Sequence, residues 1–451
     1  MQNSLSRVLP LRTAISTSAG LASAAVNFLA AVEVAEYVAG QSAWIAILVA
    51  GVLIVFAGSN FSELNGLFPS AAAIRVWIRR GVNDQTSLVS SLVYMLTVVF
   101  VIAADAFVLG HTFSAAVPAV PALVWILLLL GVVVWTNARG IKMAGRVQDA
   151  NAFILLGTLI VFSVVVLLKT PHLNQFHFFH LGSQWYEAVA LGIFIFVGFE
   201  WVTPLAEEFR DFRAIPRGMY IALGLIAVAF GLFSLALTVA FPQAHVLASS
   251  FVPQLLVGMR ALGPFGFWWM AFVTLTTAMT TFNGGLLSAS RFVYALARER
   301  VLPRWFSRLN KRLVPQNALI ALAVISFGLA VGVYLTGQYL FLINAGAGVE
   351  SFMYALSSAL VISLRRREPN RSRPFRAFGY PLVPIVSGLI FMGLGVEALL
   401  TPVTKSGFPW SLVFVLAIVG AAVLYVKWMV PRLKAQKPGP PISRVETKER
   451  V

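Results

Sequence analysis

Apolar residues follow one another along this chain in long runs, and short polar stretches separate the runs. A helix needs about 20 consecutive apolar residues to cross the hydrocarbon core of a bilayer, so a window of about 19 residues identifies such spans. Twelve spans are predicted, at residues 13–39, 43–68, 88–117, 121–136, 147–168, 186–209, 216–241, 266–297, 316–336, 339–364, 382–402 and 409–430. The pattern predicts an all-α integral membrane protein with twelve transmembrane helices.

The polar connections alternate between basic and non-basic. All but three of the 34 Lys and Arg residues fall on one side of the predicted bundle, the exceptions being Lys169, Arg260 and Lys405. Because basic loops are retained on the cytoplasmic side, this bias predicts a multi-pass protein of the plasma membrane with both termini in the cytoplasm. The alternation also supports the count of twelve, since removing one span would scramble it.

Composition agrees with a protein whose main partner is the lipid bilayer. Of 451 residues, 59% are hydrophobic and 11% are charged, and the mean hydropathy is +0.84, which excludes a soluble domain. The formal charge of +17 follows the loops of one side and therefore records orientation, not nucleic-acid binding. There is no cysteine, so neither a disulfide nor a thiolate metal site can form. No cofactor is expected.

The sixth span is unusual for a membrane helix. Residues 191–208 read L-G-I-F-I-F-V-G-F-E-W-V-T-P-L-A-E-E, with Gly198, Glu200 and Pro204 inside an apolar run. Pro removes a backbone donor, and a carboxylate in hydrocarbon is costly. A helix broken near Gly198 accounts for both residues, because it exposes polar backbone at mid-membrane, where many transporters bind substrate.

The first span opens with small residues from Ser16 to Asn27. These residues either let helices pack closely or form an unwound segment whose N–H groups hold an anion. The Asn27 amide is a candidate contact for a substrate or an ion. Glu33 and Glu36 share one face near the outer end of this span, where they line a solvated vestibule or take part in coupling.

Further polar residues lie inside other spans. Asp105 is either a substrate-side charge or a polar packing contact, and Glu350 is another acid that needs a partner. Span 8 is rich in hydroxyls. Among them Thr277 and Thr281 either bond to the preceding turn or, with carbonyls of span 1, hold a sodium ion.

Five motifs in the loops and spans resemble those of the amino acid permeases of the amino acid–polyamine–organocation superfamily, over residues 11–430. In chain order they are S-E-L-N-G-L-F-P-S, N-A-R-G-I-K-M-A-G-R-V-Q, F-V-G-F-E followed by E-E and I-P-R, S-R-F-V-Y-A-L-A-R-E-R-V-L-P, and R-R-R-E-P followed by R-P-F-R-A-F-G-Y-P. Alanines stand where the family usually has glycines after the first motif. Some proton-coupled relatives carry a lysine in helix 5, but span 5 has none before Lys169, so that form of coupling is not expected.

The resemblance implies the LeuT-type fold. It divides the chain into a cytoplasmic N-terminus (1–12), a first five-helix repeat (13–168), a second, inverted repeat (186–364), two added helices (382–430) and a basic tail (431–451). It also implies a substrate site at two broken helices. Backbone N–H groups around Ser23, Ala24 and Ala25 would meet the substrate carboxylate, and the backbone at Phe196, Val197, Gly198 and Phe199 would meet the amine, with Asn27 beside them.

We therefore expect a secondary active transporter that moves amino acids or related small amines by alternating access. An exchanger is the alternative, and a channel is less favoured because no filter-like loop recurs. An enzyme is not expected, since the spans hold no nucleophile–base pair or metal cluster. The coupling ion is H⁺ or Na⁺, with Glu200, Asp105, Thr277 and Thr281 as candidates. Glu200 alternatively bonds across the broken helix or pairs with a cationic substrate, and the excess of buried acids favours amines or basic amino acids.

Overall fold

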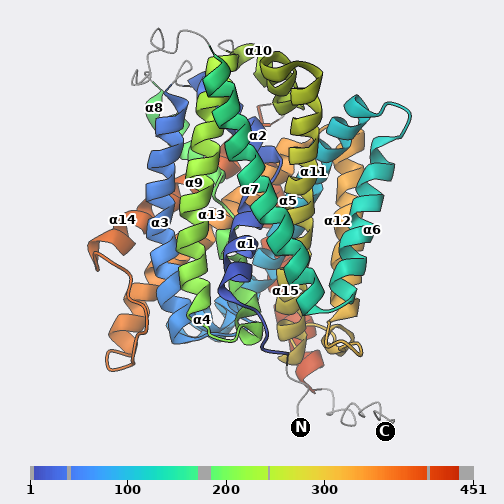
Figure 1. The fold of residues 1–451 in the computed structure, drawn as a ribbon. Helices are drawn as coiled ribbons and strands as arrows, with labels where there is room; N and C mark the ends of the chain where they lie inside the picture. Colours follow the sequence, from blue (N-terminus) through green and yellow to red (C-terminus); the bar gives the residue numbers. More distant parts are fainter. Residues whose placement is uncertain (1–4, 38–41, 171–183, 242–243, 404–406, 436–451) are drawn as a thin grey trace.

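The computed structural model describes residues 5–37, 42–170, 184–241, 244–403 and 407–435, which form one helical bundle (Figure 1). Its helices are α1 (Leu11–Ala22), α2 (Val26–Tyr37), α3 (Ala43–Leu67), α4 (Ile74–Gly81), α5 (Asp84–Ala116), α6 (Ala122–Ala138), α7 (Ile141–Lys169), α8 (Trp185–Phe194), η2 (Phe199–Glu208), α9 (Ala214–Ala240), α10 (Ala244–Ala248), α11 (Pro253–Arg298), η3 (Arg304–Ser307), α12 (Gln316–Thr336), α13 (Tyr339–Arg367), α14 (Leu382–Leu400) and α15 (Trp410–Ala435).

The predicted all-α membrane fold is confirmed. Within the described residues, ten helical segments are long and apolar enough to cross a membrane, and the bent pair of α1 and α2 makes an eleventh. The fourth predicted span corresponds to α6, which is apolar but has only 17 residues. The count of twelve stays a prediction because it depends on this shorter helix.

The first span breaks after Ala22. The N–H of Ser23 still bonds to the carbonyl of Ala19 (2.9 Å), but the backbone of Ser23 then leaves helical geometry (φ −98°, ψ 48°). The next helix, α2, begins at Val26 and is bent by 61° from α1. The chain therefore has two short helices where an unbroken span would carry one.

The sixth span also breaks, at Gly198. Its first helix, α8, ends at Phe194, and Gly198 adopts φ +103°, a conformation that residues with a side chain rarely take. The chain continues as the 3₁₀-helix η2, which contains Pro204. This break is where the sequence predicted it.

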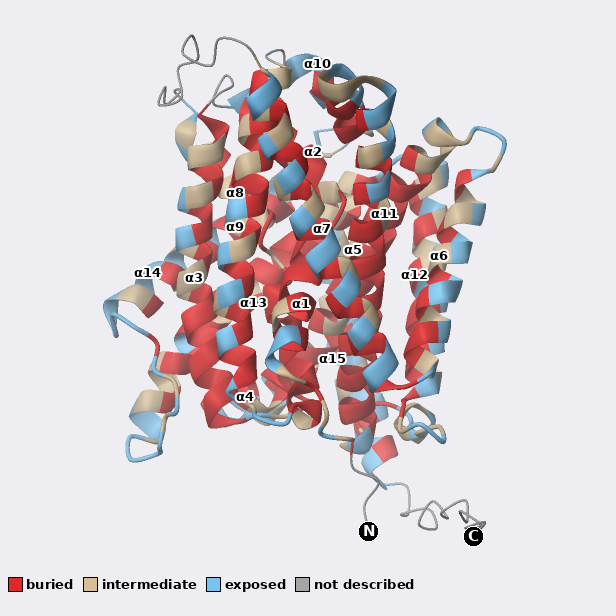
Figure 2. Ribbon diagram, in the orientation of Figure 1, coloured by how far each residue is buried: buried red, intermediate tan, exposed pale blue. Residues whose placement is uncertain are grey.

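The broken helices occupy the middle of the bundle. The segments α1 and η2 contact each other and α11, and α2 lies against α8. Figure 2 shows that the helices in the centre are mostly buried, whereas α6, α12 and α14 lie at the periphery with exposed faces. Exposed apolar side chains on these outer helices, such as Leu128, Val324 and Leu389, suit contact with lipid.

One predicted span is preceded by a second helical arm. Span 8 was predicted at 266–297, which agrees with the part of α11 that follows the sharp turn at Gly263 (φ +63°), while α11 as a whole begins at Pro253. The two arms cross closely at Gly258 and Gly266, where a Cβ on either glycine would clash with the other's carbonyl. The arm before the turn therefore packs on the end of the bundle.

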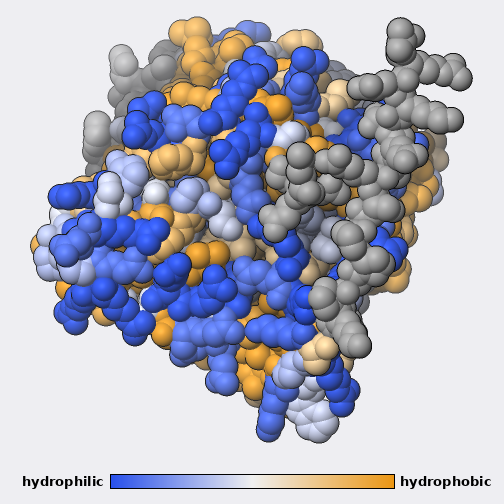
Figure 3. Space-filling view, turned by 90° about the horizontal axis from the view of Figure 1, so that it is seen from below, coloured by the Kyte–Doolittle hydropathy of each residue, from blue (hydrophilic) through white to orange (hydrophobic). Residues whose placement is uncertain are grey.

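The described chain begins at Leu5 and ends at Ala435 at the same end of the bundle, which we call the terminal face (Figure 1). Figure 3 shows this face covered largely by hydrophilic side chains. Exposed basic residues contribute to it from several loops and helix ends: Arg79, Arg80, Lys142, Arg146, Lys311, Arg312, Arg366 and Arg367. The other end is called the opposite face.

Candidate substrate site

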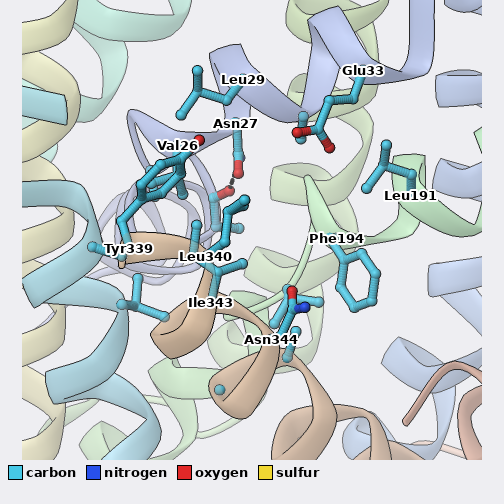
Figure 4. Close-up of a pocket in the computed structure, with 18 of the residues that line it drawn as sticks. Val26, Asn27, Leu29, Glu33, Leu191, Phe194, Tyr339, Leu340, Ile343 and Asn344 are labelled. Atoms are coloured by element: carbon cyan, nitrogen blue, oxygen red, sulfur yellow. Dashed lines mark hydrogen bonds between the residues drawn. The ribbon is translucent and has the colours of Figure 1, made fainter. Parts of the chain in front are cut away.

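A cavity of about 130 Å³ is lined by residues of both broken spans, α1/α2 and α8/η2, and by residues of α5 and α13. Figure 4 shows Asn27 and Glu33 from α2, Phe194 from α8 and Asn344 from α13 around this space. The residues that line it are Leu21, Ala22, Ala24, Val26, Asn27, Leu29, Ala30, Glu33, Val101, Ala104, Leu191, Phe194, Val197, Tyr339, Leu340, Ile343, Asn344, Gly346 and Ala347. The lining is mainly apolar with a few polar groups, as in most small-molecule sites.

A second, wider hollow of about 680 Å³ joins this cavity to the opposite face. The two share five lining residues, among them Glu33, Phe194 and Asn344. We call this hollow the vestibule. Its described lining includes four carboxylates, from Glu33, Glu36, Glu187 and Glu397, and no Lys, Arg or His. The expectation that Glu33 and Glu36 line a vestibule agrees with this geometry.

The Asn27 side chain connects the two breaks. Its amide nitrogen donates to the carbonyl of Ala22 at the end of α1 (2.6 Å) and to the carbonyl of Ile195 at the end of α8 (2.9 Å). Both carbonyls lie where a helix stops, so neither can find its usual partner four residues ahead. One side chain therefore satisfies both breaks and also lines the cavity.

Asp105 of α5 reaches the start of α2. One oxygen of its carboxyl group accepts hydrogen bonds from the N–H groups of Ala25 and Val26, the latter at 3.3 Å. The Asp105 side chain is fully buried. A helix N-terminus favours a negative group because its first N–H groups are unpaired and its dipole is positive there.

Two of the three predicted carboxylate-binding N–H groups already have partners. Ser23 donates to Ala19 and Ala25 donates to Asp105, and of the three predicted residues only Ala24 lines the cavity. At the N-terminus of α2, the acidic group that accepts these hydrogen bonds is therefore Asp105 of the protein itself.

The second break presents backbone carbonyls. Those of Phe196 and Val197 accept no hydrogen bond from the described residues, whereas the carbonyl of Gly198 accepts one from Trp201 (3.2 Å). Val197 lines the cavity, but Phe196 packs toward Gly51 of α3. The Phe199 ring packs against Phe61 and Tyr354, away from the cavity lining.

Glu200 lies deeper, beside the second break, in a cluster of buried polar side chains. Its two oxygens accept hydrogen bonds from Tyr94 of α5 (2.9 Å) and Tyr354 of α13 (2.5 Å). Glu350 of α13 faces it and accepts bonds from Trp201 (2.9 Å) and Thr97. Neither acid lines the cavity. This geometry does not favour direct pairing of Glu200 with a substrate and leaves the structural and coupling roles open.

The α11 hydroxyls make the local bonds expected for packing. Thr277 donates to the carbonyl of Val273 (2.7 Å), and Thr281 donates to that of Thr277 (3.1 Å). Thr281 also lies 3.5 Å from the carbonyl oxygen of Gly20 in α1. Oxygen atoms of α1 and α11 therefore face each other at Gly20, two residues before the end of α1. Among the described residues, no three His, Cys, Asp or Glu side chains form a metal site.

The terminal face is held together by ion pairs and backbone bonds. Asp149 of α7 accepts hydrogen bonds from Thr13 (3.1 Å) and Ser16 (2.6 Å) and pairs with Arg12 (3.0 Å). Glu208 of η2 pairs with Arg291 of α11 (3.0 Å), and both are buried.

The N-terminal segment covers the same region. The N–H groups of Val8 and Leu9 donate to the carbonyl of Glu208 (2.9 and 3.0 Å). The cavity is reached from the opposite face, while α1, η2, α7 and α11 are tied together on this side.

Several cavity residues were not predicted from the sequence. Tyr339 and Asn344 of α13 line the cavity, as do Val101 and Ala104 of α5. Asn344 carried a usable signal, since it is an amide inside an apolar span. The apolar residues carried none, because nothing in a hydrophobic run distinguishes a cavity wall from a packed core.

The sequence matches the family model described as "Amino acid permease" over residues 14–438. It is 25% identical over 349 residues to the gamma-aminobutyric acid permease of Bacillus subtilis, covering 73% of each chain. It is 26% identical over 394 residues to the human large neutral amino acids transporter small subunit 2, covering 80% of this chain and 70% of that protein.

The fold resembles a solved structure of a Na⁺-coupled sialic acid symporter in a substrate-bound, outward-open state. The TM-score is 0.57 at 13% identity, and the match covers 86% of this chain and 90% of that one. At this identity the likeness concerns the fold alone.

Proposed function

The chain belongs to the amino acid permease family, and on that premise we propose that it carries amino acids or related small amines across the membrane by alternating access. One observation carries the proposal. A cavity lined by both broken helices opens through a vestibule to one face of the bundle, while the other face is held by Asp149 and Glu208. Transporters place their substrate between discontinuous helices in this way.

We further propose that the terminal face is cytoplasmic. The exposed Arg and Lys residues of its loops support this orientation through the positive-inside rule. The vestibule then opens to the outside, and the conformation is the one that receives external substrate. The division into inverted repeats at 13–168 and 186–364 fits the same proposal, since each opens with a broken helix.

Uptake into proteoliposomes tests the transport mechanism. Purified protein is reconstituted, and uptake of radiolabelled leucine, lysine and putrescine is followed with empty and with substrate-loaded vesicles. We expect saturable uptake with mutual competition. Accumulation in empty vesicles driven by an ion gradient indicates a symporter, and uptake only into loaded vesicles indicates an exchanger. Conduction without saturation or competition would show a channel and contradict the proposal.

The paired acids favour H⁺ as the coupling ion. Glu200 and Glu350 face each other in a buried site, where two adjacent carboxyl groups cannot both be ionised at acceptable cost. The pair can therefore hold a proton in one state and release it in another, once movement of η2 alters its surroundings.

A sodium ion is the second candidate, and a different observation favours it. The hydroxyl of Thr281 and the carbonyl of Gly20 bring oxygen atoms from α11 and α1 together, and oxygen ligands suit a hard cation. Uptake measured in sodium and in potassium buffers at several pH values separates the two candidates. If Na⁺ is the coupling ion, Thr281→Val abolishes the sodium stimulation; if H⁺ is, the substitution leaves the response to pH unchanged.

A further inference from the structure

We propose that Asp105 permanently supplies the carboxylate at the first helix break, and that the substrate is a small organic amine with an apolar body and no carboxylate of its own. The inference rests on the proposed function, because it names the substrate class of the same site. It makes Asp105 a specificity-determining residue, and its first support is geometric.

The anion position at α2 is occupied. The N–H groups of Ala25 and Val26 both donate to one oxygen of Asp105. Asp105 belongs to α5 and is 80 positions from Ala25 in the sequence. The side chain is fully buried, and besides these two N–H groups it faces the hydroxyl of Thr281. A substrate carboxylate at the same N–H groups would have to displace Asp105 or lie against it, and two like charges repel strongly away from water.

Apart from the N–H of Ala24, which donates no backbone hydrogen bond among the described residues, the cavity offers little to hold a carboxylate. Its lining residues include one charged group, Glu33, which is itself acidic, and no Lys, Arg or His. The remaining polar groups, from Asn27, Tyr339 and Asn344, are neutral. The carbonyl of Val197 at the second break is free to accept a hydrogen bond. These groups suit an ammonium group, which donates hydrogen bonds and carries positive charge.

The size and apolar walls of the cavity limit the rest of the substrate. The volume is about 130 Å³, close to the ~150 Å³ apolar cavity that accepts benzene in an engineered protein. Alanine, valine, leucine and isoleucine side chains form most of the wall, with Phe194 on one side. A branched or aromatic hydrocarbon group of a few carbons fits such a space.

The vestibule that leads to the cavity is lined by acidic side chains, as the cavity is at Glu33. Glu36, Glu187 and Glu397 join Glu33 around the vestibule, and the described lining holds no basic side chain. A cleft lined by one sign of charge concentrates ligands of the opposite sign and speeds their entry. Vestibule and cavity therefore both favour a cation over a zwitterion.

Matched pairs of compounds test the inference, because each pair differs only in the carboxylate. Leucine is compared with isoamylamine and phenylalanine with phenethylamine, by thermal shift of the purified protein and by competition in proteoliposomes. We expect each amine to bind at least tenfold more tightly than its amino acid. Tighter binding of the amino acids would overturn this inference and leave the proposed transport function intact. Binding of neither member of any pair would overturn this inference, and the proposed transport function would fall only if lysine and putrescine were not transported either.

Two variants distinguish a role of Asp105 in substrate selection from a role limited to capping the N-terminus of α2. In Asp105→Ala the N–H groups of Ala25 and Val26 become free, so we expect preference to reverse toward leucine and phenylalanine. In Asp105→Asn the shape is kept and the charge is lost, so amine binding should weaken with no gain for amino acids. Gel filtration checks that both variants fold. An unchanged preference in a folded Asp105→Ala protein would refute the assignment.

Discussion

The side-chain amide of Asn27 in α2 donates a 2.9 Å hydrogen bond to the main-chain carbonyl of Ile195 at the end of α8. The two residues are 168 positions apart in sequence, and each belongs to a different broken helix. The same amide also donates to the carbonyl of Ala22, so one side chain bonds to the backbone at both breaks. The pair is thus positioned to make the two breaks act together.

Replacement of Asn27 should uncouple the breaks. In Asn27→Ala the carbonyls of Ala22 and Ile195 lose their donor, and each buried group left unsatisfied costs about 1–3 kcal/mol. We expect lower thermal stability and at least a tenfold loss of uptake. Asn317→Ala is the matched control, since that amide bonds to the Trp305 carbonyl at an exposed position. Equal effects of the two substitutions would contradict the role given to Asn27.

Glu200→Gln tests proton coupling. The groups that face Glu200 are Tyr94, Tyr354 and Glu350, all uncharged or acidic. The amide keeps much of the hydrogen bonding but cannot carry a proton, so we expect accumulation driven by a pH gradient to disappear while exchange between loaded vesicles continues. Uptake is measured from pH 5 to 8. If Glu200→Gln retains transport and its pH dependence, the coupling hypothesis fails.

Removal of one partner of the buried ion pair should be costly. Glu208 and Arg291 have side-chain exposures of 1% and 0%. Arg291→Met leaves a buried carboxylate without its cation, which typically destabilises by about 3–5 kcal/mol. Arg298→Met is the control, because Arg298 is 44% exposed in its pair with Glu207 and such pairs contribute only about 0–1 kcal/mol. Thermal unfolding in detergent compares the two, and a similar loss in both would be inconsistent with this account.

The ion pair of Asp149 with Arg12 should hold the terminal face closed. Asp149→Asn weakens three interactions with α1 and its N-terminal end, so we expect the conformation open at the terminal face to gain population. The chain has no cysteine, so a single Ala24→Cys in the cavity reports access without background. Labelling by a membrane-impermeant thiol reagent from the vestibule side should slow in the Asp149→Asn background. Unchanged or faster labelling there would show that this pair does not control access.

The membrane fold was readable from the sequence because its main determinant is local. Hydropathy alone places α3, α9 and α12 within a few residues of their predicted positions. The arm of α11 after Gly263 was predicted within a few residues, whereas the packing of the arm before it was not, because that packing depends on the close approach of Gly258 to Gly266. The break at Gly198 was predictable, since glycine and proline act on the backbone around them wherever they occur.

The sequence by itself therefore determined the membrane class, the resemblance to the permeases and the break at Gly198, whereas the first break was implied only by the resemblance. Only the tertiary structure decided what the polar residues do. Asp105 reaches the N–H groups of Ala25, and Glu200 faces Glu350, across separations that no sequence pattern records. The reason is physical: hydropathy and backbone preference act between neighbours in the chain, whereas the partner of a buried charge is fixed by which distant helices pack beside it.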